Sequence, residues 1–238
     1  MFICEHLRQK NVEASPSYNL CMRTRIKICG LKTLEHVDAA VDAGADAVGF
    51  VLYPPSVRAI DLTALTTLTQ RVPAFVSTVA LFVNPSVEEV KAALAAARIE
   101  LLQFHGSQDY ETPEFCSQFG RPYMKAFAVD TQFDLLKSQQ RYASAAALLL
   151  DTPSAGHGGS GQTFDWNLIP CQQPNNTANA TSAPAPRVVL SGGLTAANVA
   201  DAINTVRPFA VDVSSGVESS RGVKDVKLIY EFCAAVPN

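Results

Sequence analysis

The sequence predicts an α/β protein built as a single (β/α)8 barrel, in which eight parallel strands alternate with helices. The chain has 238 residues, 47% of them hydrophobic, which suits one large core, and such barrels commonly run to about 250 residues as one domain. Short, near-continuous apolar runs recur along the chain, as is typical of parallel strands buried on both faces. Helix signals lie between these runs and indicate βαβ units. Six strands would favour an open sheet, whereas eight favour a closed barrel.

Each expected strand is a short apolar or β-branched run that ends near a polar or glycine-rich segment. In chain order the expected strands are Arg25–Cys29, Ala47–Leu52, Thr78–Val83, Glu100–Phe104, Tyr123–Phe127, Ala147–Leu150, Val188–Ser191 and Ala210–Val213.

Helix-capping residues occupy the gaps between these runs. Ser86 and Glu89 have capping-box spacing, and Pro113 follows Thr112 at a first helical position. The expected N-terminal caps are Thr33, Ser86, Thr112, Asp130 and Thr195. Gly44 is suited to end the first helix, and apolar residues at helical spacing predict a last helix over about Lys224–Ala235.

Two segments do not fit the strand-helix repeat. Residues 1–22 have neither sustained periodicity nor the apolar region of a secretory signal, so they indicate either a disordered leader or a natural start at Met22. The barrel is expected over residues 23–238. Residues 170–186 are rich in Pro, Asn, Thr, Ala and Gln and lack charge, which is typical of a flexible surface insertion.

Composition argues against several classes of partner and site. The net charge of -3 is spread without long runs of one sign, so neither nucleic acid nor an anionic membrane is an expected partner. The six cysteines contain no C-x-x-C pair and lack the spacing of a zinc site or a disulfide framework. Reduced thiols in the cytoplasm are therefore the expectation.

Glycine-bearing turns follow the last two expected strands. Gly192 and Gly193 follow Ser191, and Gly216 follows Ser215. Glycine lets backbone N–H groups approach an anion, and the loops after strands seven and eight form the usual phosphate site of this fold. Tight turns alone would also explain a single Gly-Gly pair, but the two positions together favour a phosphate site.

Two residues at strand ends are candidates for proton transfer. Cys29 ends the first expected strand, where a cysteine is either an inert core residue or a functional thiol. Asp151 follows three leucines at the end of the sixth strand. It is either a helix cap or loop anchor, or a carboxyl group whose pKa is raised by partial desolvation, which would suit a general acid.

The strand-end motifs together resemble the phosphoribosylanthranilate isomerase family of tryptophan biosynthesis, from about Arg25 to the C-terminus. They are K-I-C-G-L at 27–31, G-A-D-A-V-G-F-V at 44–51, Y-P-P-S-V-R at 53–58, L-F-V-N at 81–84, Q-F-H-G at 103–106, L-L-L-D-T at 148–152, G-G-S-G-Q-T-F-D-W at 158–166, L-S-G-G-L at 190–194 and V-D-V-S-S-G-V-E at 211–218.

The resemblance implies an Amadori rearrangement of N-(5-phosphoribosyl)anthranilate to 1-(2-carboxyphenylamino)-1-deoxyribulose 5-phosphate, without metal or organic cofactor. It assigns Asp151 as general acid and Cys29 as general base. It also places the anthranilate carboxylate on Arg58, for which the alternative is an ordinary surface arginine without this role. The chain is expected to be a monomer or a homodimer. Phe104 and Gln162 depart from the family pattern, which often has leucine and lysine there.

Three further polar residues lie on or at the ends of expected strands. His105 and Lys125 are expected to make structural hydrogen bonds rather than to act in catalysis, and Asp212 is expected to be buried and to orient a neighbour. Three rival functions remain. They are the aminoaldose isomerase of histidine synthesis, in which an aspartate would replace Cys29, a lyase with Lys125 as Schiff-base residue, and a barrel that binds a phosphate ligand without turnover.

Overall fold

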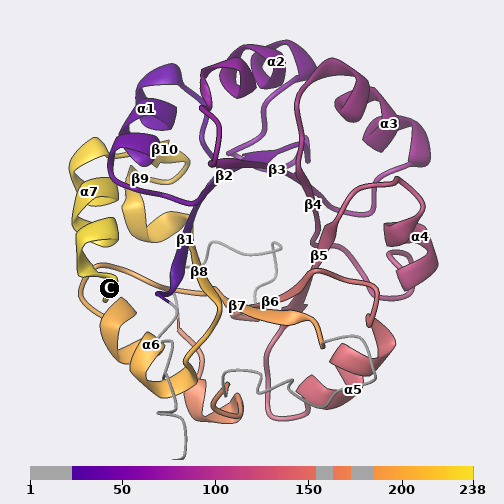
Figure 1. Cartoon of the computed structure of the whole chain (residues 1–238), viewed down its shortest axis with the longest axis vertical. Helices are drawn as coiled ribbons and strands as arrows, with labels where there is room; N and C mark the ends of the chain where they lie inside the picture. The colour runs from indigo at the N-terminus through magenta and orange to yellow at the C-terminus, as the bar shows by residue number, and fades with distance from the viewer. Residues whose placement is uncertain (1–22, 154–162, 173–184, 238) are drawn as a thin grey trace, which may run out of the picture.

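The computed structural model describes residues 23–153, 163–172 and 185–237. In this part of the chain eight strands form a closed barrel in which every neighbouring pair is parallel, and β1 pairs with β8 to close it. Figure 1 shows the ring of strands surrounded by helices. The predicted (β/α)8 barrel is therefore confirmed. The proposed leader and most of the proposed insertion lie outside the described residues.

The strands lie within one residue of the predicted bounds at either end. They are β1 (Arg25–Cys29), β2 (Ala47–Val51), β3 (Ser77–Phe82), β4 (Leu101–Phe104), β5 (Tyr123–Ala128), β6 (Ala147–Asp151), β7 (Arg187–Leu190) and β8 (Ala210–Val213). The helices are α1 (Leu34–Asp42), α2 (Leu62–Arg71), α3 (Val87–Ala96), α4 (Pro113–Ser117), α5 (Leu135–Arg141), α6 (Val199–Val206) and α7 (Val226–Ala235), with 3-10 helices η1 (Trp166–Leu168) and η2 (Ser215–Val217).

Alternate residues of each strand face opposite sides of the barrel wall. Met124, Ala126, Leu149 and Val189 pack together in one small cluster inside the barrel. The intervening residues join the larger core between strands and helices. This period of two decides which polar side chains can reach the barrel interior.

Local signals explain where most helices begin. The side chains of Thr33, Ser86 and Thr112 accept hydrogen bonds from backbone N–H groups in the first turns of α1, α3 and α4, as predicted. Gly44 has a positive φ of 90° just after α1. Asp130 and Thr195 were wrong as caps, because α5 begins after Asp134 and α6 after Asn198.

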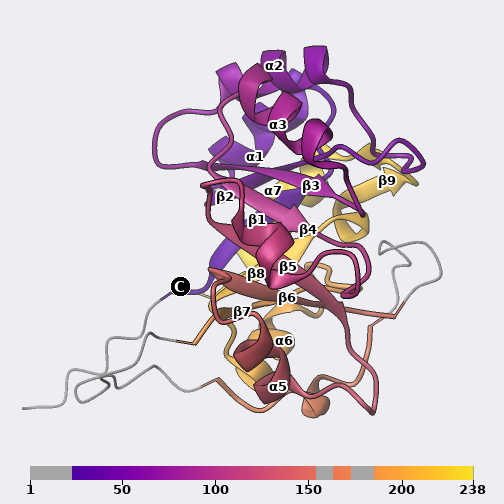
Figure 2. The ribbon, with the colours of Figure 1, turned by 90° about the vertical axis from the view of Figure 1, so that its right-hand side faces the viewer.

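A short antiparallel hairpin, β9 (Glu218–Ser220) and β10 (Val223–Lys224), follows β8 and has no counterpart in the sequence analysis. Figure 2 shows β9 at the end of the molecule opposite the C-terminus. Within the residues that the structure describes, no helix is long and apolar enough to cross a membrane.

Candidate active site

A cavity of about 310 Å³ opens at the C-terminal ends of the barrel strands. Every residue predicted for the site lines it. The predicted residues on its wall are Cys29, Arg58, Asp151, Gly192, Gly193, Ser215 and Gly216. Residues that come from five different strands or the loops after them therefore meet in one place, as expected at this end of such a barrel.

Cys29 lies at the end of β1 and points into the cavity. Its side chain packs against Val51, Leu81 and Val83, and only 4% of the residue is exposed. Burial raises the pKa of the Cys29 thiol because a thiolate loses hydration there, whereas the nearby Lys27 ammonium lowers it. Cys29 is thus a buried thiol beside a cation and faces the space where a ligand would lie.

Asp151 ends β6 on the wall of the same cavity. Its Oδ1 accepts a hydrogen bond from Thr152 N at 2.8 Å, and Oδ2 lies 3.5 Å from His105 Nε2. Burial raises the pKa of Asp151 to about 6, although the Thr152 hydrogen bond lowers it. A carboxyl group with this pKa retains its proton closer to neutral pH than an exposed aspartate does, which suits an acid.

A buried ion pair crosses the barrel interior beneath these groups. Lys27 Nζ donates to Asp212 Oδ1 at 2.6 Å, and Ser191 Oγ lies 3.3 Å from Asp212 Oδ2. Asp212 is buried and paired, as expected from its strand position. The sequence did not indicate Lys27 as its partner, although both residues occupy inward positions of adjacent strands.

The glycines after β7 and β8 occupy positions that other residues would not fit. Gly192 and Gly193 have φ values of 87° and 63°. A Cβ atom at Gly192 would lie 2.4 Å from Thr152 Oγ1, and one at Gly216 would lie 1.8 Å from Leu194 O. The positive φ values and these short distances explain why glycine occupies both turns, and both turns line the cavity.

Arg58 reaches the cavity with its guanidinium already engaged. Arg58 Nε and Nη2 donate to the two carboxylate oxygens of Glu218 at 2.7 and 2.8 Å. Lys224 Nζ also binds Glu218 Oε1 at 2.8 Å. Burial would raise the pKa of Glu218, but these two cations hold it at about 2. A ligand carboxylate at Arg58 would therefore share the guanidinium with Glu218.

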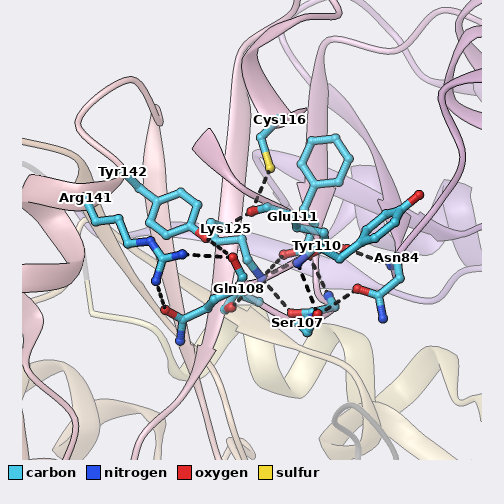
Figure 3. A network of polar contacts seen from close by, with 12 residues as sticks. Asn84, Ser107, Gln108, Tyr110, Glu111, Cys116, Lys125, Arg141 and Tyr142 are labelled. Atoms are coloured by element: carbon cyan, nitrogen blue, oxygen red, sulfur yellow. Dashed lines mark hydrogen bonds and ion pairs between the residues drawn. The ribbon is translucent and has the colours of Figure 1, made fainter. Parts of the chain in front are cut away.

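Lys125 lies on the other side of the barrel wall. Met124 and Ala126 belong to the interior cluster, so Lys125 between them points outward. Its ammonium pairs with Glu111 Oε2 at 3.0 Å and donates to Gly106 O at 2.9 Å, with no exposure of either charged side chain (Figure 3). The expectation of a structural role for Lys125 agrees with this geometry, which opposes a Schiff-base lysine in the cavity.

Comparison with known proteins agrees with this architecture. The sequence model of the family described as N-(5'phosphoribosyl)anthranilate (PRA) isomerase matches residues 26–235. This chain belongs to the PRA isomerase family. It is 51% identical over 215 residues to N-(5'-phosphoribosyl)anthranilate isomerase of Methylibium petroleiphilum, covering 90% of this chain and 94% of that protein. The Dechloromonas aromatica isomerase is 50% identical over 215 residues, covering 90% and 97%.

Solved structures of PRA isomerases share the fold. The Thermotoga maritima isomerase is 39% identical with a TM-score of 0.76, covering 90% of this chain and 98% of that one. A phosphoribosyl anthranilate isomerase in complex with reduced 1-(o-carboxyphenylamino)-1-deoxyribulose 5-phosphate is 36% identical with a TM-score of 0.73, over the same shares of the two chains.

In this member of the PRA isomerase family, the cavity also includes residues that sequence reasoning did not assign to the site. Tyr53, Gln103, His105 and Arg221 line it. Gln103 Oε1 is buried and has no hydrogen-bond partner among the described residues. The alternation of inward positions along β4 could have indicated Gln103 and His105. In contrast, Arg221 lies in the hairpin that the sequence did not predict.

Of the two departures from the family pattern, the structure describes Phe104, which lies away from the cavity wall. Phe104 is fully buried outside the barrel, where its ring stacks with Phe82 and Phe119. It is not among the described residues that line the cavity. Gln162 lies outside the described residues. In the part of the chain that the structure describes, no cluster of three or more His, Cys, Asp or Glu side chains is arranged to hold a metal ion.

Proposed function

We propose that this chain converts N-(5-phosphoribosyl)anthranilate to 1-(2-carboxyphenylamino)-1-deoxyribulose 5-phosphate, a step of tryptophan biosynthesis. One observation carries the proposal beyond family membership. A buried thiol and a carboxyl group with a raised pKa line a cavity that also contains two glycine-bearing turns. An Amadori rearrangement needs one proton donor, one proton acceptor and a place for the phosphate.

Asp151 is the general acid of the proposed reaction. Its proton passes to the ribose ring oxygen while the bond from C1 to that oxygen breaks, and the anthranilate nitrogen forms a C=N bond to C1. The product is an open-chain iminium, and Asp151 becomes a carboxylate. The raised pKa of Asp151 supports this role, since the carboxyl group must begin protonated.

Cys29 is the general base. The iminium makes the C2 proton acidic, so a thiolate is basic enough to remove it. The electron pair of the C2–H bond forms a C1–C2 double bond, the iminium nitrogen becomes neutral, and Cys29 becomes a thiol. The enolamine then tautomerises to the ketone, which is the product: C1 gains a proton and the C2 hydroxyl loses one. Proton exchange with solvent returns Asp151 to the acid and Cys29 to the thiolate.

The remaining site residues bind the two ends of the substrate. Backbone groups at Gly192, Gly193, Ser215 and Gly216, which line the cavity, hold the phosphate. Arg58 holds the anthranilate carboxylate, since a guanidinium can bind two carboxylates at once through different N–H groups. The pair with Glu218 keeps its charge in place before substrate binds.

The proposal includes no metal, organic cofactor, nucleic acid or membrane partner. The chain would act in the cytoplasm as a monomer or a homodimer. The rival aminoaldose isomerase of histidine synthesis is disfavoured by the thiol at position 29, and the lyase by the position of Lys125 outside the barrel. A binding protein without turnover would not need the acid and base in one cavity.

The test is a fluorescence assay. Adding the protein to N-(5-phosphoribosyl)anthranilate should cause anthranilate-type fluorescence to fall with enzyme-dependent kinetics. Substrate that lacks the phosphate should bind poorly, and inorganic phosphate should compete with the intact substrate. Turnover of the histidine-pathway aminoaldose with no turnover of the anthranilate compound would refute the proposal.

A further inference from the structure

The proposed mechanism makes no use of the buried Lys27–Asp212 pair. Only 5% of the Lys27 side chain and 6% of the Asp212 side chain are exposed, and their charged atoms are 2.6 Å apart. Burying two charges costs free energy that their attraction does not always recover, so such a pair is weak evidence of a stabilising role. Its position beneath the proposed base suggests a role in the site.

Lys27 and Cys29 are two residues apart on β1 and therefore face the same side of the barrel wall. Gly49 on β2 leaves space for both. A Cβ atom at Gly49 would lie 2.9 Å from Cys29 Sγ and 3.1 Å from Lys27 Nζ. The sulfur and the ammonium thus approach the same point, and the positive charge of Lys27 lowers the pKa of the thiol.

We propose that Lys27 is a positioning residue whose ammonium, held in place by Asp212, stabilises the thiolate form of Cys29 that abstracts the proton. This role rests on Cys29 being the base in the proposed function. A thiolate in an apolar cavity needs a nearby positive charge, because desolvation otherwise favours the neutral thiol. Lys27 supplies that charge from beneath, where it leaves the cavity open to substrate.

Two other cations face Cys29, but both have a different partner. Lys224 Nζ donates to Ser214 O at 2.7 Å and pairs with Glu218. Arg58 is bidentate with Glu218. Lys27 has the larger lowering effect on the pKa of the Cys29 thiol, and Lys224 a smaller one.

Asp212 holds Lys27 in place, but its charge counteracts the effect of Lys27 on the pKa of the Cys29 thiol. Its negative charge raises the pKa of Cys29 and also that of Asp151 across the cavity. Burial would lower the pKa of Lys27, but Asp212 and Cys29 raise it to about 12, so the lysine stays charged. Removing Lys27 should therefore raise the pKa of Cys29, and removing Asp212 should lower it. A purely structural ion pair would not produce these opposite shifts.

The test measures the rate at which iodoacetamide alkylates Cys29, as a function of pH and without substrate. The modified Cys29 peptide is quantified by mass spectrometry. Lys27→Met should raise the midpoint of the rate profile by at least one pH unit, which corresponds to a tenfold loss of thiolate at a given pH below it. Asp212→Asn should lower the midpoint, and the ascending limb of kcat/KM should move with it in both variants.

The double variant Lys27→Met/Asp212→Asn guards against misfolding, because it leaves neither buried charge unpaired. Its midpoint should lie above that of the wild type and below that of Lys27→Met. Wild-type midpoints in both the Lys27→Met and the double variant would overturn the proposal, as would shifts of the same sign in the two single variants. The titration is independent of turnover, so a shifted midpoint in a protein inactive toward the substrate would refute the proposed function and not the role of Lys27.

Discussion

Asp151 illustrates how a single side chain can be suited to chemistry at some cost to stability. Its pKa in the folded protein is raised by burial from 3.8 to about 6. Below the lower value both the folded and unfolded states hold the proton. Between the two values the folded state keeps a proton that the unfolded state has lost, so stability falls as pH rises. Above about pH 6 the full penalty remains.

Asp151→Asn should therefore stabilise the folded protein at neutral pH, by on the order of 1–3 kcal/mol. The amide keeps an acceptor for Thr152 N but carries no charge. Urea unfolding at pH 7.5 and pH 4 should show the gain at the higher pH and little difference at the lower one. The exposed Asp109→Asn is the control and should change neither. A variant less stable than wild type at pH 7.5 would contradict this account of Asp151.

Position at a strand end made Cys29 and Asp151 candidates in the sequence, and the family resemblance gave them their proposed roles. Lys27 could not be found in the same way, since a lysine within a strand ordinarily indicates a solvent-facing position. Its partner Asp212 lies 185 residues away along the chain. Only closure of the barrel between β1 and β8 makes that position buried and places the two charges together.

At the scale of elements, Glu111 and Lys125 connect the loops after β3 and β4 to β5. Glu111 Oε1 accepts from Asn84 N at 2.8 Å, and Oε2 accepts from Gly106 N at 2.7 Å (Figure 3). Lys125 also donates to Gly106 O. These bonds fix the backbone next to His105, whose ring lies beside Asp151. The pair thus supports the site from outside the barrel.

Glu111→Gln should destabilise the protein by about 3–5 kcal/mol, because it leaves the Lys125 ammonium buried without a counter-charge. The double variant Glu111→Gln/Lys125→Met should recover part of that loss. Thermal unfolding measures both. The matched control is Asp38→Asn, which removes an exposed ion pair with Arg71 and should leave Tm nearly unchanged. Equal Tm values for Glu111→Gln and wild type would show that the buried pair is dispensable.

The start of a helix was predictable where the residue just before it also caps the helix with a side-chain acceptor. Thr33, Ser86 and Thr112 meet that condition. Asp130 instead accepts from Gln132 N in a turn, and Thr195 N donates to the Asn198 side chain before α6 begins. The same residue types favour turns and caps, so the sequence alone could not separate the two.

At the scale of the whole molecule, the repeat of apolar runs was enough to predict the barrel and the end at which its site lies. The β9–β10 hairpin was not predictable, because its short strands include polar residues and lack the apolar run that marked the others. It nevertheless contributes Glu218, which pairs with Arg58 and with Lys224 of the same hairpin. The predicted leader and insertion remain predictions, since residues 1–22 and 173–184 are outside the described part of the chain.

The most direct test of the central claim is the pH dependence of kcat/KM for N-(5-phosphoribosyl)anthranilate in wild type, Cys29→Ala and Asp151→Asn. The wild-type profile should be bell-shaped, with an ascending limb for the thiolate and a descending limb for the carboxylic acid. Each variant should remain folded and lose about 10²–10⁴ in kcat, with the ascending limb absent in Cys29→Ala and the descending limb absent in Asp151→Asn. Near-wild-type turnover by Cys29→Ala would contradict the account.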